Sequence, residues 1–168
     1  AWYGGRGQSP RAMAAYHRGG EYDSLLQVVQ ADAVIRRASL KPADVLAVLD
    51  QCPAAVLKAH PFALLVLMRS MFNWRQIPRM LELKDLLMAA IEEHPELPAE
   101  ERGNLLGECD LIMSFLCYND ISAMSRLHRS ASSQMSHPAI SIQKSGGWTF
   151  GSPSVLMMFY RGPGELEQ

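Results

Sequence analysis

Three histidine–proline pairs divide this chain at nearly regular intervals, and their spacing limits the folds open to it. The prolines of His60–Pro61, His94–Pro95 and His137–Pro138 lie 34 and 43 residues apart. Proline disfavours helix in the residue before it, and a histidine at a helix C-terminus interacts favourably with the helix dipole. We therefore expect each pair to end a helix. Repeats of this length that hold two helices are typical of α-solenoids such as tetratricopeptide arrays.

A metal site built from the three histidines is the alternative interpretation of these pairs. Equivalent positions of successive solenoid repeats lie about 10 Å apart at helix-packing distance, which is too far for one ion. The three cysteines, Cys52, Cys109 and Cys117, contain no Cys-x-x-Cys pair. We expect them to be reduced, buried thiols, and we expect neither a metal nor another cofactor.

Between the pairs, apolar residues recur at helical spacing, and the expected helices are themselves paired. Within 78–93 the predicted inward face is Met80, Leu83, Leu87 and Ile91. Asp120 is placed to cap the helix that follows it. The expected helices span 10–18, 21–30, 42–51, 54–59, 62–73, 78–93, 99–118 and 121–134, and 155–160 begins a third repeat that we expect to be cut short.

Two glycines one helical turn apart, Gly103 and Gly107, stand inside the expected helix 99–118. Glycine in a helix costs about 1 kcal/mol relative to alanine. The presence of two glycines despite this cost indicates close contact with a neighbouring helix.

The composition favours one globular domain over 1–168 and disfavours several kinds of partner. The chain has 168 residues, of which 48% are hydrophobic, and 16 Lys and Arg against 17 Asp and Glu give a net charge of −1. Nucleic-acid binding relies on clustered cations, so we expect none by this segment. No apolar run reaches the length of a membrane span, and the N-terminus does not resemble a signal peptide. We expect a cytoplasmic protein that does not bind membranes.

A Gly-rich loop with two aromatic residues is the most specific stretch of the chain. Trp148 and Phe150 are too large and apolar for solvent, so we expect the loop to pack onto the helices. With four other stretches it resembles the helical sensor segment of MalT-like regulators, the large ATP-dependent branch of the LuxR family of bacterial transcription activators. The stretches are 45–53 (VLAVLDQCP), 57–65 (LKAHPFALL), 75–83 (RQIPRMLEL), 146–154 (GGWTFGSPS) and Tyr160–Arg161.

The resemblance implies an all-α, tetratricopeptide-like superhelix of antiparallel helix pairs that senses a small-molecule inducer or binds a regulatory protein. The nucleotide-hydrolysing and DNA-binding modules of such regulators are not in this sequence, and neither a P-loop nor a G-x-S-x-G motif occurs. We expect no enzymatic activity. A stand-alone helical-repeat scaffold for protein interactions is the alternative function.

The resemblance to tetratricopeptide arrays also places a candidate binding surface. There the first helix of each repeat lines the concave face, so 62–74, 99–118 and 155–160 are expected to form one surface. Polar and aromatic residues that interrupt these apolar helices are expected to project from it, and Trp148 is a further candidate contact. The alternative is that some of these residues only satisfy hydrogen bonds between repeats. Self-association through the shortened last repeat is a further expectation. The candidate residues are Arg69, Asn73, Trp74, Glu108, Tyr118, Trp148 and Tyr160.

Overall fold

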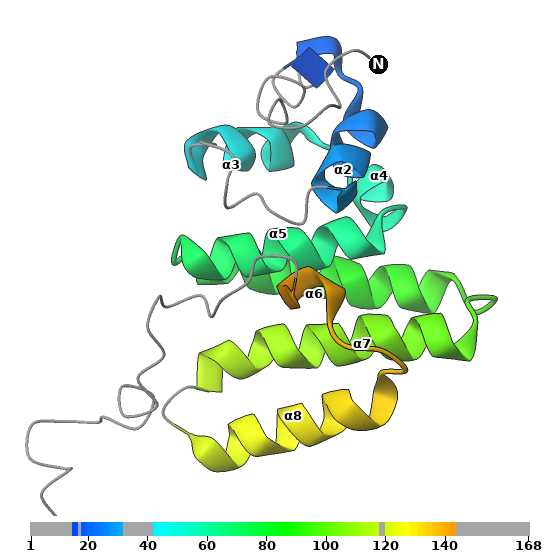
Figure 1. Cartoon of the computed structure of the whole chain (residues 1–168). Coiled ribbons are helices and arrows are strands. Elements are labelled where there is room, and N and C mark those ends of the chain that lie inside the picture. Colours follow the sequence, from blue (N-terminus) through cyan, green and yellow to red (C-terminus); the bar gives the residue numbers. More distant parts are fainter. Residues whose placement is uncertain (1–14, 17, 32–41, 118–119, 144–168) are drawn as a thin grey trace, which may run out of the picture. The chain divides into compact units, whose positions relative to one another are not determined.

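A computed structural model gives the fold and describes residues 15–16, 18–31, 42–117 and 120–143 (Figure 1). Within these ranges every regular element is a helix and no strand occurs, which confirms the all-α class. Backbone contacts divide the chain into two compact units. Among the described residues, the first unit runs to Leu97 and includes Ile140–Gln143, and the second is Pro98–Ala139. A single domain over 1–168 stays a prediction.

The helices of the first unit agree with the expected ranges to within one residue at each end. Helix 10–18 lies mostly outside the described residues, and the short α9 was not expected. The helices are α2 (Tyr22–Ala31), α3 (Pro42–Gln51), α4 (Ala54–Lys58), α5 (Pro61–Asn73), α6 (Ile77–Glu93) and α9 (Ile140–Gln143).

Helix α5 forms the centre of the first unit. Its residues 63–71 are all buried, and it contacts α2, α4, α6 and α9. A helix that is apolar on every side needs such cover. Helix α6 instead buries one face, and the predicted inward residues Met80, Leu83, Leu87 and Ile91 are all buried, which confirms that prediction.

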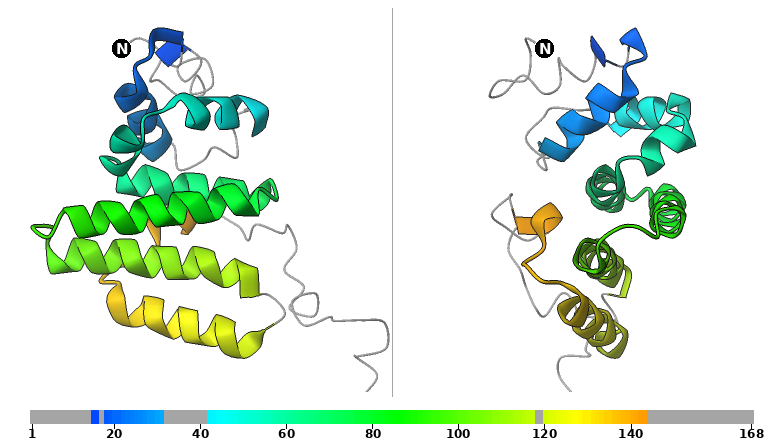
Figure 2. Two further views of the ribbon diagram at one scale, coloured as in Figure 1. Left: turned by 180° about the vertical axis from the view of Figure 1, so that it is seen from behind. Right: turned by 90° about the vertical axis from the view of Figure 1, so that its right-hand side faces the viewer.

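The corner between α5 and α6 closes with two backbone hydrogen bonds of the Schellman type. Gln76 N donates to Met71 O at 2.8 Å, and Arg75 N donates to Phe72 O at 3.0 Å. This pattern requires a residue in the left-handed backbone conformation after the helix. Glycine usually fills this position, but here Arg75 adopts the conformation, with φ 57°. The short corner makes α5 and α6 an antiparallel hairpin, seen end-on in Figure 2.

The three histidine–proline pairs differ in how they follow the end of a helix. His94 is the C-cap of α6, as expected. His60 instead precedes α5 as its N-cap, with Pro61 as the first helical residue, and α8 already ends three residues before His137. Proline suits the first turn of a helix because the N–H that it lacks would have no partner there. A helix stop is therefore confirmed at His94 and at His60, which follows the end of α4 and also begins α5, whereas α8 ends at its predicted last residue, Gln134, before it reaches His137.

The second unit is a hairpin of α7 (Ala99–Ser114) and α8 (Ile121–Gln134), which lie side by side in both figures. The expected helix 99–118 ends as an α-helix at Ser114 and continues as a 3₁₀ turn, η1 (Phe115–Cys117). Helix α8 has the predicted bounds. Its cap is also confirmed, because the Asp120 carboxylate accepts a hydrogen bond from Ala123 N at 2.8 Å.

The two glycines of α7 lie against the last turn of α8 and the residue after it. A Cβ at Gly103 would collide with the carbonyl oxygen of Gln134, and one at Gly107 would collide with the side chain of Met135. The predicted close contact is confirmed: the lack of side chains lets the two backbones approach.

Among the described residues, no helix has both the length and the apolar character needed to cross a bilayer. None of the three cysteines forms a disulfide, and Cys52 and Cys109 are buried while Cys117 is half-buried.

Candidate functional site

Two residues of the predicted surface are buried, so their placement on a surface was wrong. Arg69 on α5 is 4% exposed and Glu108 on α7 is 2% exposed. The prediction assumed that a polar residue in an apolar helix faces solvent. On α7, however, the buried positions are not confined to one stripe and include Leu105, Gly107 and Glu108.

Arg69 is buried because a later part of the chain covers it. Its guanidinium Nη1 donates a hydrogen bond to the carbonyl oxygen of Ser141 on α9, a buried residue 72 positions further along the chain. A charged group inside a protein needs such a partner. Arg69 therefore holds α9 against α5 within the first unit.

Two other predicted residues occupy the end of α5. Asn73 and Trp74 are half-buried, with Trp74 as the C-cap, and the buried Oδ1 atom of Asn73 has no hydrogen-bond partner in the described structure. Tyr118, Trp148 and Tyr160 lie outside the described residues, as do 155–160 and the Gly-rich loop. For these residues the binding surface stays a prediction.

A groove between the end of α3, α4 and α6 is the cavity that we select as the candidate site. It has a volume of about 540 Å³ and an apolar floor of Leu49, Leu57, Leu83 and Leu86. Helices α4 and α6 pack together, and Lys58 of α4 donates to Glu93 Oε2 of α6 at 2.7 Å, beyond the groove. We call this cavity the α3–α6 groove.

Charged side chains line the α3–α6 groove. Arg79 Nη2 donates to Asp50 Oδ1 at 2.9 Å, and Nη1 donates to Glu82 Oε2 at 2.5 Å. The buried Nε of Arg79 has no partner in the described structure. Asp85 also lines the groove and is exposed. Three carboxylates against one guanidinium make the lining acidic.

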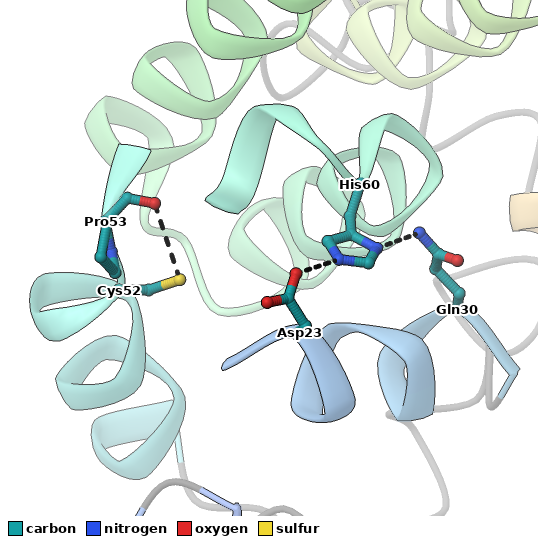
Figure 3. Close-up of polar contacts among 5 residues, drawn as sticks. All are labelled: Asp23, Gln30, Cys52, Pro53 and His60. Atoms are coloured by element: carbon teal, nitrogen blue, oxygen red, sulfur yellow. Dashed lines mark hydrogen bonds and ion pairs between the residues drawn. The ribbon is translucent and has the colours of Figure 1, made fainter. Parts of the chain in front are cut away.

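Cys52 contributes a thiol to the same groove. Burial, together with a smaller contribution from the negative charge of Asp23, raises the pKa of the Cys52 thiol to about 11. Its sulfur lies 3.8 Å from the carbonyl oxygen of Pro53 (Figure 3). The thiolate is the nucleophilic form of cysteine, so at neutral pH this group acts as a small apolar side chain.

A histidine held by two partners joins α2 to the start of α5 (Figure 3). Gln30 Nε2 lies 3.2 Å from His60 Nδ1, and His60 Nε2 lies 3.0 Å from Asp23 Oδ1. With the amide in this orientation Nδ1 accepts, so the ring proton is on Nε2 and is donated to the carboxylate. Both ring nitrogens are engaged, which leaves none to act as a base on a substrate. We interpret this trio as a structural clamp.

A serine–histidine pair in the second unit is also structural. Ser114 is fully buried and its Oγ donates to Leu111 O at 2.6 Å. The hydroxyl has only this one proton to donate, so toward His128 it can only accept. His128 Nε2, which lies 3.0 Å away, therefore donates to Ser114 Oγ. A histidine that donates to the hydroxyl does not activate it as a nucleophile. The described residues also contain no group of three or more His, Cys, Asp or Glu placed to hold a metal ion.

Sequence reasoning missed the α3–α6 groove, the clamp and the serine–histidine pair. Asp50 and Arg79 are separated by 29 residues, and Asp23 and His60 by 37. No local motif links positions so far apart. The one available signal was the charge at Asp50, Arg79 and Glu82 beside apolar residues of α3 and α6.

No protein-family model, curated protein or solved structure matches this chain. Its function must therefore be inferred from its own residues.

Proposed function

We propose that this chain is a protein-interaction module whose docking site is the α3–α6 groove. The observation that carries the proposal is the combination of a leucine floor with an acidic lining. Apolar cavities with a few placed polar groups are the usual form of a binding site. Both ring nitrogens of the clamp histidine are engaged, and Ser114 is not activated by His128, which favours binding over an enzymatic function.

The groove chemistry indicates what its partner carries. Asp50 and Glu82 are engaged by Arg79, whereas Asp85 has no ion pair in the described residues. An apolar side chain reaching Leu57 and Leu86 would gain burial, and a Lys or Arg beside it would pair with Asp85. The proposed partner is therefore a segment with an apolar anchor flanked by basic residues.

We propose a tetratricopeptide-like superhelix as the finer architecture. The hairpins α5–α6 and α7–α8 follow one another, and their first helices begin at Pro61 and Ala99. This spacing of roughly 40 residues lies within the range of two-helix repeats. Helices of 13 to 17 residues joined by short corners also suit such an array.

The setting that we propose is the sensor segment of a MalT-like regulator of the LuxR family. The support is the sequence resemblance of 45–53, 57–65, 75–83, 146–154 and Tyr160–Arg161 alone. Sequencing the gene beyond Gln168 tests it. A reading frame that continues into a helix-turn-helix is the expected result, and one without it would favour the stand-alone scaffold.

A binding titration tests the groove. The probe is a short fluorescein-labelled amphipathic peptide of leucine and lysine, followed by anisotropy at about 0.15 M salt. Leu86→Asp places an unpaired charge in the floor, and we expect it to weaken binding about tenfold or more, or about 1.4 kcal/mol. Asp85→Lys should weaken binding by charge repulsion.

Matched controls lie on the same helix. Leu81 is 40% exposed and does not line the groove, so Leu81→Asp should leave affinity unchanged, as should Glu92→Lys. Equal weakening by Leu86→Asp and Leu81→Asp, with helicity retained in both, would exclude the groove as the docking site.

A further inference from the structure

The face of α8 turned away from α7 carries arginines. Ser122, Arg126, Arg129 and Ser133 follow at steps of four, three and four residues, which places them on one face of a helix. All four are exposed. The opposite face holds Ala131, which is buried, and half-buried residues such as Ala123 and Leu127. We call the four exposed residues the α8 basic face.

The positive charge of this face is not neutralised within the described structure. Helix α8 contains no acidic residue, and neither Arg126 nor Arg129 has an ion pair there. Nearby carboxylates bind neutral groups instead. Asp110 accepts from Gln134 at 3.0 Å, Glu100 accepts from Ser136 at 2.7 Å, and Asp120 caps α8.

From this charge pattern we propose that the α8 basic face binds an acidic helical segment of a partner protein. The guanidinium fork pairs with a carboxylate through two parallel hydrogen bonds. Arg126 and Arg129 lie about one turn apart, which matches carboxylates spaced three or four residues apart on a second helix. The exposed Ser122 hydroxyl adds a donor on the same face.

The geometry favours an acidic protein segment over a nucleic acid. The four residues span about 16 Å along the helix axis, or about three turns of a partner helix. Nucleic-acid affinity depends on the number of phosphates neutralised, and two arginines in a chain of net charge −1 offer few. This surface belongs to the second unit, and its partner is acidic, whereas the partner proposed for the α3–α6 groove is basic. The two proposals can therefore be tested independently.

A charge-reversal experiment tests the proposal. The probe is a fluorescein-labelled, glutamate-rich helical peptide, titrated with the full chain by anisotropy at two salt concentrations. The variant Arg126→Glu with Arg129→Glu should bind it at least about tenfold more weakly, and its remaining binding should depend less on salt. Circular dichroism checks that the variant stays folded.

A control of equal charge separates local recognition from net charge. Arg75→Glu with Lys84→Glu makes the same change of net charge on the first unit, and we expect it to retain affinity within about twofold, since neither residue belongs to the α8 basic face. Equal losses in the two double variants would overturn the proposal, as would a wild-type chain that does not bind the peptide. Duplex DNA that binds more tightly than the peptide and depends on the same arginines would also overturn it.

Discussion

At the scale of single residues, this structure uses its buried polar groups to hold helices together. Arg69 fixes α9, His60 fixes α2, and Ser114 accepts from His128 across the α7–α8 hairpin. Each of these hydrogen bonds is made within one unit. A buried polar group left unpaired costs about 1 to 3 kcal/mol, so these contacts define the packing more than they create reactivity.

Cys52 gives a test of the residue-scale account. Its pKa is raised to about 11, so the thiol keeps its proton through the range in which an ordinary thiol loses it. In a chain with Cys109→Ser and Cys117→Ser, the rate of alkylation by iodoacetamide should rise with pH until about 11, as followed by mass spectrometry. The free energy of unfolding should fall between about pH 9 and pH 11. In that interval the folded state still holds the thiol proton, whereas the unfolded chain, with a thiol pKa of 9.0, has released it.

Circular dichroism at each pH controls for unfolding. A rate that levels off near pH 9 while the chain remains folded would show that Cys52 is not buried as described.

At the scale of elements, close backbone contact defines the α7–α8 hairpin. Gly103→Ala should destabilise the chain by about 1 to 3 kcal/mol, the usual cost of overpacking, because the carbonyl of Gln134 has little room to move. Alanine's better helix propensity, about 1 kcal/mol, offsets only part of this. Urea denaturation measures the difference.

Two further substitutions sharpen this prediction. Gly107→Ala should cost less, since the nearest atoms belong to the flexible side chain of Met135, and Gly19→Ala, which meets only ordinary contacts, should cost nothing. A Gly103→Ala chain as stable as the wild type would mean that the helices are further apart than described.

The helices were predictable from sequence because their signals are local. Pro42 and Asp120 mark the starts of α3 and α8, and the apolar spacing of α6 identifies its inner face. The binding features were not predictable in the same way. The burial of Arg69 depends on a segment 72 residues away, and the groove joins residues of three helices. Such contacts are decided by tertiary packing, which periodicity does not encode.

At the scale of the whole molecule, the two units offer surfaces of opposite character. The first carries a leucine-floored acidic groove, and the second carries the α8 basic face. In our two proposals, these surfaces bind segments of opposite charge although the net charge of the chain is near zero. Both surfaces fit the protein-interaction module that we propose.

An NMR titration tests the central claim, docking in the α3–α6 groove, most directly. The ¹⁵N-labelled chain is titrated with the unlabelled leucine–lysine peptide, and amide shift changes are mapped on the sequence. The account predicts changes concentrated at the end of α3, in α4 and in the first half of α6, and their loss in Leu86→Asp but not in Leu81→Asp. Changes confined to α7 and α8, or spread evenly over acidic positions of the chain, would contradict it.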